Sequence, residues 1–352
     1  MQLPIAITLG DPAGIGPETI VKAFRDAPDV TQACFVVGDI ATLRRAARIV
    51  AADALLLPVV QIDHVAQALS CPPRCLPVMQ IAAAALQGTN LPELGRVSAQ
   101  AGQMAGDCVV WAAQAALRGE VAALVTAPLN KAALALAGLP HAAFPGHTEM
   151  LQSLAAEHLQ LPLAQLPVRM MLANPELRVV LLSIHVSMQQ ALAALTFEQV
   201  LLTLQITHRS LQAILGRAPR IGVAGVNPHA GEGGLFGREE IEVIAPAIAA
   251  ACAQGIDARG PFAPDTVFMR ARTTLTSPGE FDVVLAMYHD QGLIPVKYLG
   301  VEQGVNVTLG LPLVRTSPDH GTAFDIAGTG LADASSLIEA IRMAKQLCQC
   351  KI

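Results

Sequence analysis

The feature that most constrains the fold is an alternation of short β-branched runs with longer stretches rich in alanine and leucine. Buried strands favour β-branched residues, and helices between them are typical of α/β proteins. We therefore predict an α/β fold. The predicted strands are "PIAITL", "CFVVG", "AALVTA", "VRMML", "RVVLLSI", "RIGVAGV", "FDVVLAM" and "GVNVTL"; helix candidates include "ATLRRAARIVAA", "SAQAGQMAGDCVVWAAQAAL" and "FEQVLLTLQITHRSLQAIL".

The segment "VRMMLANPELRVVLLSI" departs from this alternation, because only "ANPEL" joins its two strand-like runs. Such a turn predicts an antiparallel hairpin. A hairpin of this kind is exposed on one side unless something covers it, which makes it a candidate dimer element. The chain contains no internal repeat and no low-complexity linker, so a second lobe must form by the chain crossing over and returning.

Composition narrows the class of protein. Hydrophobic residues make up 53% of the 352 residues and charged residues only 14%, against about 25% charged in typical proteins. This excess predicts much buried apolar surface, including surface buried against a second subunit. A net charge of −5 and 3% aromatic residues argue against nucleic-acid binding.

The sequence shows neither a membrane-spanning pattern nor a signal-peptide pattern. No apolar run approaches the ~18 residues that span a bilayer, and the N-terminal segment lacks a basic signal-peptide region. We therefore expect a cytoplasmic protein without a membrane partner. The seven cysteines are scattered. A zinc site formed by Cys71, Cys75, Cys348 and Cys350 would have poor spacing, so reduced thiols without a function are the preferred interpretation.

Three of the nine histidines follow strongly apolar predicted strands. His185 follows "RVVLLSI", His229 lies in "NPHAGEGG" after "RIGVAGV", and His289 follows "FDVVLAM". Ligands of open α/β sheets bind at the carboxyl ends of strands. A single histidine there is usually a core or turn residue, but three imidazoles with an open position suit a catalytic divalent metal such as zinc. Because three histidines share this position, a metal site is favoured over three unrelated core or turn residues.

Other polar groups follow predicted strands. "GDPAGIGPE" is either a tight strand-to-helix turn or a phosphate-binding loop. Lys131 is more often a solvated residue than a catalytic one. Lys297, Asn306 and Arg315 lie in the last third of the chain, and lysine with arginine is a common pair for binding a phosphate or carboxylate.

Six segments, in order, closely resemble the 4-hydroxythreonine-4-phosphate dehydrogenase family from about residue 5 to about residue 340. They are "GDPAGIGPE", "FPGHTE", "NPHAGEGGLFGREE", "APDTVF", "AMYHDQGLIPVK" and "GVNVTLGLPLVRTSPDHGTAFDIAG". The resemblance implies two α/β/α lobes around a central cleft, as in isocitrate and isopropylmalate dehydrogenases. Residues 1–128 with 297–352 would form the first lobe, and residues 129–296 the second, with the metal ligands and dimer contacts.

The resemblance also implies roles for individual residues. His185, His229 and His289 would bind a divalent metal (zinc, magnesium, cobalt or manganese) at a homodimer interface, with ligands from both subunits. The phosphorylated substrate would contact His147, Thr148, Lys297, Asn306 and Arg315. "HGTAFDIAG" is similar to the cofactor loop of isopropylmalate and isocitrate dehydrogenases, so Gly321, Asp325 and Gly328 would bind NAD or NADP.

The implied activity is NAD-dependent oxidation and decarboxylation of 4-phosphooxy-L-threonine to 3-amino-2-oxopropyl phosphate, in pyridoxal 5′-phosphate biosynthesis. One departure bears on the substrate: family members often carry Pro-Leu-Arg after the first metal histidine, whereas this chain has "HVSMQQAL". Relatives that act on D-threonate or D-erythronate 4-phosphate resemble the chain nearly as well. Lys297, Asp265 and Asp290 are all candidates for the proton acceptor.

Two other classes of function remain open at this point. An acyl or phosphoryl transferase could share the fold, but it would not need three histidines on a metal. A non-catalytic module that binds metal or phosphate would use the same residues without turnover.

Overall fold

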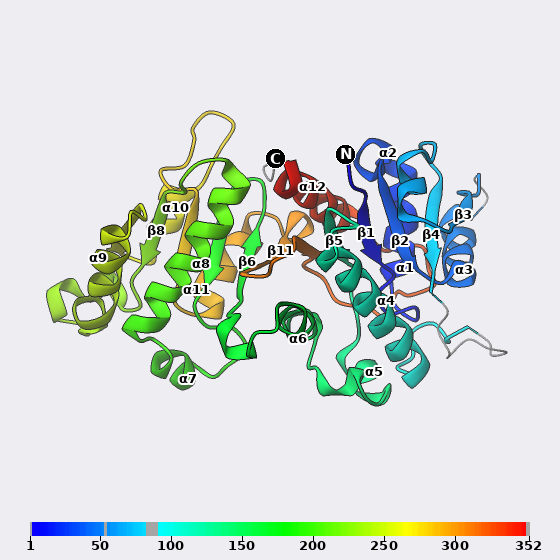
Figure 1. Cartoon of the computed structure of the whole chain (residues 1–352). Coiled ribbons are helices and arrows are strands. Elements are labelled where there is room, and N and C mark those ends of the chain that lie inside the picture. The colour runs from blue at the N-terminus through cyan, green and yellow to red at the C-terminus, as the bar shows by residue number, and fades with distance from the viewer. Residues whose placement is uncertain (1, 53–54, 82–90, 350–352) are drawn as a thin grey trace. The chain divides into compact units, whose positions relative to one another are not determined.

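The computed structural model describes residues 2–52, 55–81 and 91–349 (Figure 1). The chain divides into two compact units. Unit 1 comprises Met1–Pro167 with Leu311–Cys348, and unit 2 comprises Val168–Gly310. Both contain a sheet with helices, so the predicted α/β class is confirmed. Within the described ranges, no helix is long and apolar enough to cross a membrane.

Unit 1 contains six strands in the order β3-β4-β2-β1-β5-β12, and every pairing among them is parallel. All residues of β1, β2, β5 and β12 are buried, as expected for a parallel sheet with both faces covered. The strands are β1 (Ile5–Thr8), β2 (Cys34–Gly38), β3 (Val59–Ile62), β4 (Leu76–Gln80), β5 (Ala123–Thr126) and β12 (Arg315–Pro318).

Helices of unit 1 begin where side chains can cap them. The carboxylate of Asp39 accepts the N–H of Thr42 (2.7 Å), and the side chain of Asn130 accepts the N–H of Ala133 (2.9 Å). The helices are α1 (Gly16–Asp26), α2 (Pro28–Thr31), α3 (Ile40–Ala51), α4 (Ala99–Leu117), α5 (Lys131–Leu136), α6 (His147–Leu159) and α12 (Ser335–Gln349), with short 3-10 turns η1 (Val65–Leu69), η3 (His141–Ala143) and η4 (Leu163–Gln165).

The division of the chain differs from the lobe boundaries expected from the sequence. Residues 129–167 belong to unit 1, because α5 and α6 both pack against α4. At Gly102 a Cβ atom would lie 1.9 Å from the carbonyl oxygen of Ala133, so only glycine permits this approach of α4 to α5. Residues 297–310 belong to unit 2, because β11 pairs with β6 there.

Unit 2 contains the strand order β11-β6-β7-β10-β8-β9. β7, β10, β8 and β9 are parallel neighbours, whereas β6 is antiparallel to both β7 and β11. The strands are β6 (Arg169–Ala173), β7 (Arg178–Leu181), β8 (Ile221–Ala224), β9 (Ala258–Phe262), β10 (Val283–Ala286) and β11 (Val305–Leu309).

The predicted hairpin is confirmed as β6 and β7. Asn174 forms its turn: the side-chain oxygen accepts the N–H groups of Glu176 (2.9 Å) and Leu177 (2.8 Å). The hairpin has no free edge, however, because β11 pairs with β6 and β10 pairs with β7. Both edges of the hairpin are therefore covered within the sheet, and its role as a dimer element stays a prediction.

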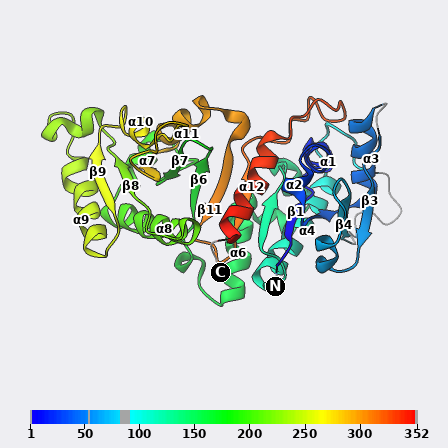
Figure 2. The same cartoon turned by 90° about the horizontal axis from the view of Figure 1, so that it is seen from above.

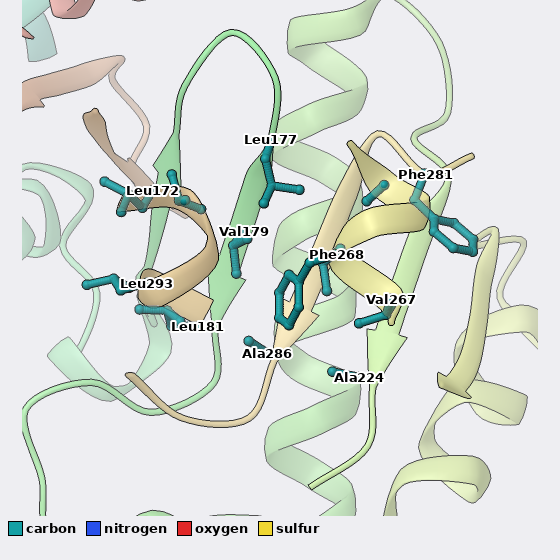
Figure 3. Close-up of a cluster of buried hydrophobic side chains, with 13 residues drawn as sticks. Leu172, Leu177, Val179, Leu181, Ala224, Val267, Phe268, Phe281, Ala286 and Leu293 are labelled. Atoms are coloured by element: carbon teal, nitrogen blue, oxygen red, sulfur yellow. The ribbon is translucent and has the colours of Figure 1, made fainter. Parts of the chain in front are cut away.

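The helices of unit 2 cover an apolar core (Figure 3). Leu172, Leu181, Phe268, Phe281 and Leu293 are among its buried members. α9 packs beside β9, as Figure 2 shows. The helices are α7 (Met188–Ala193), α8 (Phe197–Leu215), α9 (Ala245–Ala253), α10 (Val267–Ala271) and α11 (His289–Tyr298), with the 3-10 segments η5 (Pro228–Gly234) and η7 (Val301–Gln303) and the π-helical segment η6 (Glu240–Ile244).

Candidate active site

The three candidate metal ligands all lie at one edge of the unit 2 sheet. β7, β10 and β8 are consecutive and parallel, so their carboxyl ends point the same way. His185 follows β7, His289 is the first residue of α11 after β10, and His229 lies in η5 after β8. The strand order therefore delivers three imidazoles to the edge where ligands of α/β sheets bind.

His185 and His289 form a close pair at this edge. Their ring centroids are 5.6 Å apart and the rings are tilted by 45°. Both line an open pocket together with Ser187 and Tyr288. Nδ1 of His289 lies 2.7 Å from Oδ1 of Asp290. A carboxylate on one ring nitrogen orients the imidazole and directs the other nitrogen, Nε2, toward a ligand.

His229 lies apart from this pair. Its side chain is largely exposed, with Nδ1 3.9 Å from the carboxylate of Glu232, and its ring centroid is 6.3 Å from that of Phe236. Among the described residues, no group of three or more histidine, cysteine, aspartate or glutamate side chains surrounds a single point. The structure thus brings two predicted ligands together and places the third on the same edge. As donors, two imidazoles with an orienting carboxylate fit a divalent metal.

The loop that carries His229 has an unusual backbone. Residues 229–233 all have positive φ angles: 54° at His229, 52° at Ala230, 79° at Gly231, 43° at Glu232 and 65° at Gly233. Residues other than glycine avoid this region for steric reasons, and such strain gathers at functional sites.

Glu240 is bound to the start of the same loop. Its carboxylate accepts the N–H groups of Val226 and Asn227, each at 2.8 Å, and it is only 2% exposed. Burial raises its pKa, but these hydrogen bonds outweigh burial and hold the pKa below its ordinary value. Sequence reasoning missed Glu240, although it lies in the quoted motif "NPHAGEGGLFGREE".

A second cluster, in unit 1, is cationic. Arg315 opens β12 and is 7% exposed, and its guanidinium donates to Oγ1 of Thr126 from Nε (3.1 Å) and Nη2 (2.7 Å). Burial lowers the pKa of Arg315 to about 10, and the nearby carboxylate of Glu149 raises it in part. Arginine stays charged at neutral pH at this value, so the unit holds a buried cation.

His147 lies beside Arg315. It begins α6, and Thr148 follows it on the same helix. Burial, followed by the charges of Arg315 and Lys131, holds the pKa of His147 well below its ordinary value. Its Nε2 is buried with no hydrogen-bond partner among the described atoms. A buried donor or acceptor of this kind calls for a ligand.

Lys131, expected from the sequence to be a solvated residue, is exposed at the start of α5, next to the same cluster. A Cβ atom at Gly146 would lie 3.6 Å from Cε of Lys131, which places the lysine stem against the start of α6. Two cations, a neutral imidazole and a helix N-terminus therefore converge, and this combination suits a phosphate or another dianion. The sequence signal was its position five residues after the end of β5 at Thr126.

The other two predicted substrate residues belong to unit 2. Lys297 is exposed near the end of α11. Asn306 is half-buried in β11, opposite Leu172 of β6. The predicted substrate set is thus split between the units, with His147, Thr148 and Arg315 in unit 1.

Asp265 and Asp290, two candidates for the proton acceptor, have different surroundings in the structure. Asp265 is exposed in the turn after β9, a parallel neighbour of β8. Asp290 is exposed and bound to the ring of His289, which suits orientation of that ring. Lys297 remains a third candidate.

The predicted cofactor loop, with Gly321, Asp325 and Gly328, packs against the N-terminal glycine motif. The carboxylate of Glu18 accepts the N–H groups of Gly328 (2.6 Å) and Gly330 (2.8 Å). A Cβ atom at Gly14 would lie 2.8 Å from the carbonyl oxygen of Thr322. "GDPAGIGPE" therefore forms a tight turn that packs against this loop, and phosphate binding by this turn stays a prediction.

Three comparisons identify similar proteins. The sequence matches the family described as "Pyridoxal phosphate biosynthetic protein PdxA" over residues 30–344. It is 49% identical to 4-hydroxythreonine-4-phosphate dehydrogenase of Beijerinckia indica, over 98% of this chain and 95% of that protein. It is 44% identical to D-threonate 4-phosphate dehydrogenase of Salmonella typhimurium, over 97% of this chain and 98% of that protein.

A solved structure agrees with these matches. The crystal structure of 4-hydroxythreonine-4-phosphate dehydrogenase from Klebsiella pneumoniae superposes with a TM-score of 0.84 at 44% identity. The match covers 99% of this chain and 100% of that one. The dehydrogenase-like α/β fold expected from the sequence is thereby confirmed.

Asp11, in the glycine motif, generates a prediction about stability. It is fully buried, its Oδ1 accepts the N–H of Ala13 (2.8 Å), and burial raises its pKa from 3.8 to about 6 despite backbone N–H groups of Ala13 and Asn130 that lower it. The folded state therefore binds the proton more tightly than the unfolded state. The contribution of Asp11 to the free energy of unfolding is therefore largest below pH 4. It decreases by roughly 3 kcal/mol in total as pH rises through the folded-state pKa of about 6.

We expect Asp11→Asn to raise the free energy of unfolding at pH 7 by on the order of 1–3 kcal/mol, because the amide keeps the acceptor for Ala13 and carries no charge. Urea unfolding at pH 4, 5, 6 and 7 measures it. The matched control is Asp63→Asn, since Asp63 is exposed. A variant whose stability keeps the wild-type pH slope would contradict the assignment.

Proposed function

The chain belongs to the pyridoxal phosphate biosynthetic protein PdxA family, and we propose that it oxidises and decarboxylates 4-phosphooxy-L-threonine to 3-amino-2-oxopropyl phosphate. The protein is an oxidoreductase, as its relatives are named dehydrogenases. The observation that carries the proposal is the histidine-bearing sheet edge of unit 2, which supplies the donors for a metal-assisted oxidation. D-Threonate or D-erythronate 4-phosphate is the alternative substrate, favoured by the 44% identical D-threonate enzyme.

The substrate phosphate would bind in the cationic cluster of unit 1. Arg315, Lys131 and the start of α6 offer charge and N–H donors, and His147 offers an unpartnered buried nitrogen. Lys297 and Asn306, in unit 2, are the other substrate contacts that the family resemblance implies. Fixing the phosphate orients the carbon that is oxidised, and orientation contributes to the rate by itself.

The metal would be held by His185, His229 and His289, and Asp290 would orient His289. When bound, a divalent ion (zinc, magnesium, cobalt or manganese) would polarise the oxygen of the reacting hydroxyl and stabilise negative charge on it. Lys297, Asp265 or Asp290 would take the proton that this hydroxyl loses.

The nicotinamide cofactor, NAD or NADP, would bind along the loop of Gly321, Asp325 and Gly328. Glu18 and Lys22 support that loop: Nζ of Lys22 donates to the carbonyl oxygens of Gly330 (2.7 Å) and Ala332 (2.6 Å). When bound, this cofactor accepts the hydride. The protein's own contribution is a loop held in place by contacts with α1.

A homodimer in the cytoplasm completes the proposal. Exposed apolar side chains flank the metal-ligand candidates: Val186, Met188 and Leu192 near His185, and Leu235 and Phe236 near His229. Apolar patches on a chain so poor in charge are typical of subunit contacts. A second copy covering them would bring ligands from both subunits to one metal.

A substrate panel tests the reaction. We expect NADH or NADPH to appear at 340 nm with one of three 4-phosphorylated four-carbon acids: 4-phosphooxy-L-threonine, D-threonate 4-phosphate or D-erythronate 4-phosphate. Assaying each with NAD and with NADP identifies substrate and cofactor together. Acetyl transfer from acetyl phosphate to coenzyme A with release of phosphate, and no reduced nicotinamide, would instead establish a transferase. No turnover with any of these compounds would indicate a binding module.

The metal ligands generate the next prediction. Alanine at His185, His229 or His289 should lower kcat/KM by at least a hundredfold, because each removes a ligand whose metal polarises the reacting oxygen. Circular dichroism should show a folded protein. His158→Ala is the control, since His158 is exposed on α6. Full activity in a metal-stripped histidine variant would contradict the assignment.

The same variants test the shared site. His185 and His289 lie side by side in one subunit, so the ligand from the other subunit would be His229. Mixing inactive His229→Ala and His289→Ala proteins should then restore part of the activity through mixed dimers with one intact site. Sedimentation velocity gives the subunit number. A fully active monomer would exclude a site that requires two subunits.

Arg315 tests for the phosphate. Charge-assisted hydrogen bonds contribute about 1.5–3 kcal/mol each, so Arg315→Ala should raise KM for the phosphorylated substrate roughly ten- to a hundredfold. A dephosphorylated analogue should be affected far less. The control is Arg118→Ala, whose exposed side chain pairs with Glu120. Equal losses with both substrates would mean that Arg315 binds the carboxylate or supports the fold.

A further inference from the structure

We propose that Glu240 is a positioning residue whose buried carboxylate fixes the left-handed turn of residues 229–233, and thereby the place of His229. The inference rests on the proposed role of His229 as a metal ligand. It adds a residue outside the expected site set, and it explains how a side chain on an exposed loop can have a defined position.

The first support is the number of donors that one carboxylate binds. Oε1 of Glu240 accepts the N–H groups of Val226 and Asn227, each at 2.8 Å, and Oε2 accepts Nδ2 of Asn227 at 3.0 Å. These donors come directly before Pro228 and His229 in the chain. Hydrogen bonds to a buried carboxylate are strong and directional, so the entry to the turn is fixed.

The second support is the backbone strain that follows. His229, Ala230 and Glu232 have φ angles of 54°, 52° and 43°, a region that L-residues with a Cβ avoid. A run of such residues persists only when its surroundings determine it. Glu240 provides that constraint at the entry to the turn.

The third support is steric. A Cβ atom at Gly225 would lie 2.9 Å from Oε1 of Glu240, and a Cβ atom at Gly231 would lie 2.8 Å from its Oε2. The loop therefore wraps the carboxylate closely on both sides, where only glycine fits. Glu240 itself opens the π-helical segment η6, a rare geometry that is frequent at functional sites.

The test compares Glu240→Gln with Glu242→Gln in the full-length protein. Glutamine preserves size but removes the charge that strengthens the bonds at Oε1, and its amide nitrogen at the Oε2 position faces Nδ2 of Asn227, a donor that it cannot accept. Glu242 is the matched control, because it is an exposed carboxylate in the same segment, paired with Arg238. Zinc binding to the metal-stripped proteins is titrated against a chromogenic chelator, with circular dichroism as the check on folding.

We expect Glu240→Gln to weaken zinc binding about ten- to a hundredfold, as losses of supporting residues do at metal sites, while Glu242→Gln binds like the wild type. Hydrogen exchange should increase at residues 226–233 in Glu240→Gln alone. If Glu240→Gln fails to fold, Gly231→Ala takes its place, since its Cβ displaces the same carboxylate, and the same loss is expected.

His229→Ala separates this inference from the function on which it rests. Wild-type zinc affinity in His229→Ala would remove the ligand assignment, and the inference with it. A different outcome would overturn only the inference about Glu240. In that outcome His229→Ala loses zinc binding, whereas folded Glu240→Gln (or Gly231→Ala, where that variant is used) keeps the zinc affinity and hydrogen exchange of the wild type.

Discussion

The parallel pairing of β7, β10 and β8 is the constraint on which the histidine site depends. Their backbone ladders bring Leu181, Ala286 and Ala224 to the same edge of the unit 2 sheet. Segments about fifty to a hundred residues apart in sequence thus end side by side. Because all residues of these strands except Arg178 are buried, a one-residue slip of register would turn core side chains the wrong way. The packing of the strands therefore also determines the positions of the three histidines that follow them.

Much of this arrangement could be predicted from the sequence. The helix expected at "FEQVLLTLQITHRSLQAIL" is α8, and strands expected at "CFVVG" and "FDVVLAM" are β2 and β10. β12 was not predicted, because "RTSP" is polar. All four residues are nevertheless buried, since Thr316 donates to the carbonyl oxygen of Ala340 (2.7 Å) and Arg315 donates to Thr126. These partners are far apart in sequence, so no local pattern reveals that the polar groups are satisfied.

The candidate site shows the same division. Histidines after apolar strands could be identified, because side-chain type and strand ends are both visible in a sequence. Lys131 and Glu240 could not be ranked, because their meaning depends on neighbours: the start of α6 for the lysine and the N–H groups of Val226 and Asn227 for the glutamate. The lobe boundaries failed for a related reason, since Gly102 permits a close contact of α4 with α5 that periodicity does not encode.

Two buried glutamates, Glu18 and Glu240, each bind the backbone N–H groups of a loop. Glu18 is 1% exposed and accepts the N–H groups of Gly328 and Gly330, in the predicted cofactor loop. Glu240 is 2% exposed and accepts those of Val226 and Asn227, before His229. Burying a carboxylate is costly unless hydrogen bonds satisfy it. Each glutamate meets that condition with backbone donors of a loop that has no sheet to pair with. The desolvation cost of the charge is thus offset by the same bonds that order the loop, which explains why a chain with 14% charged residues keeps both carboxylates inside.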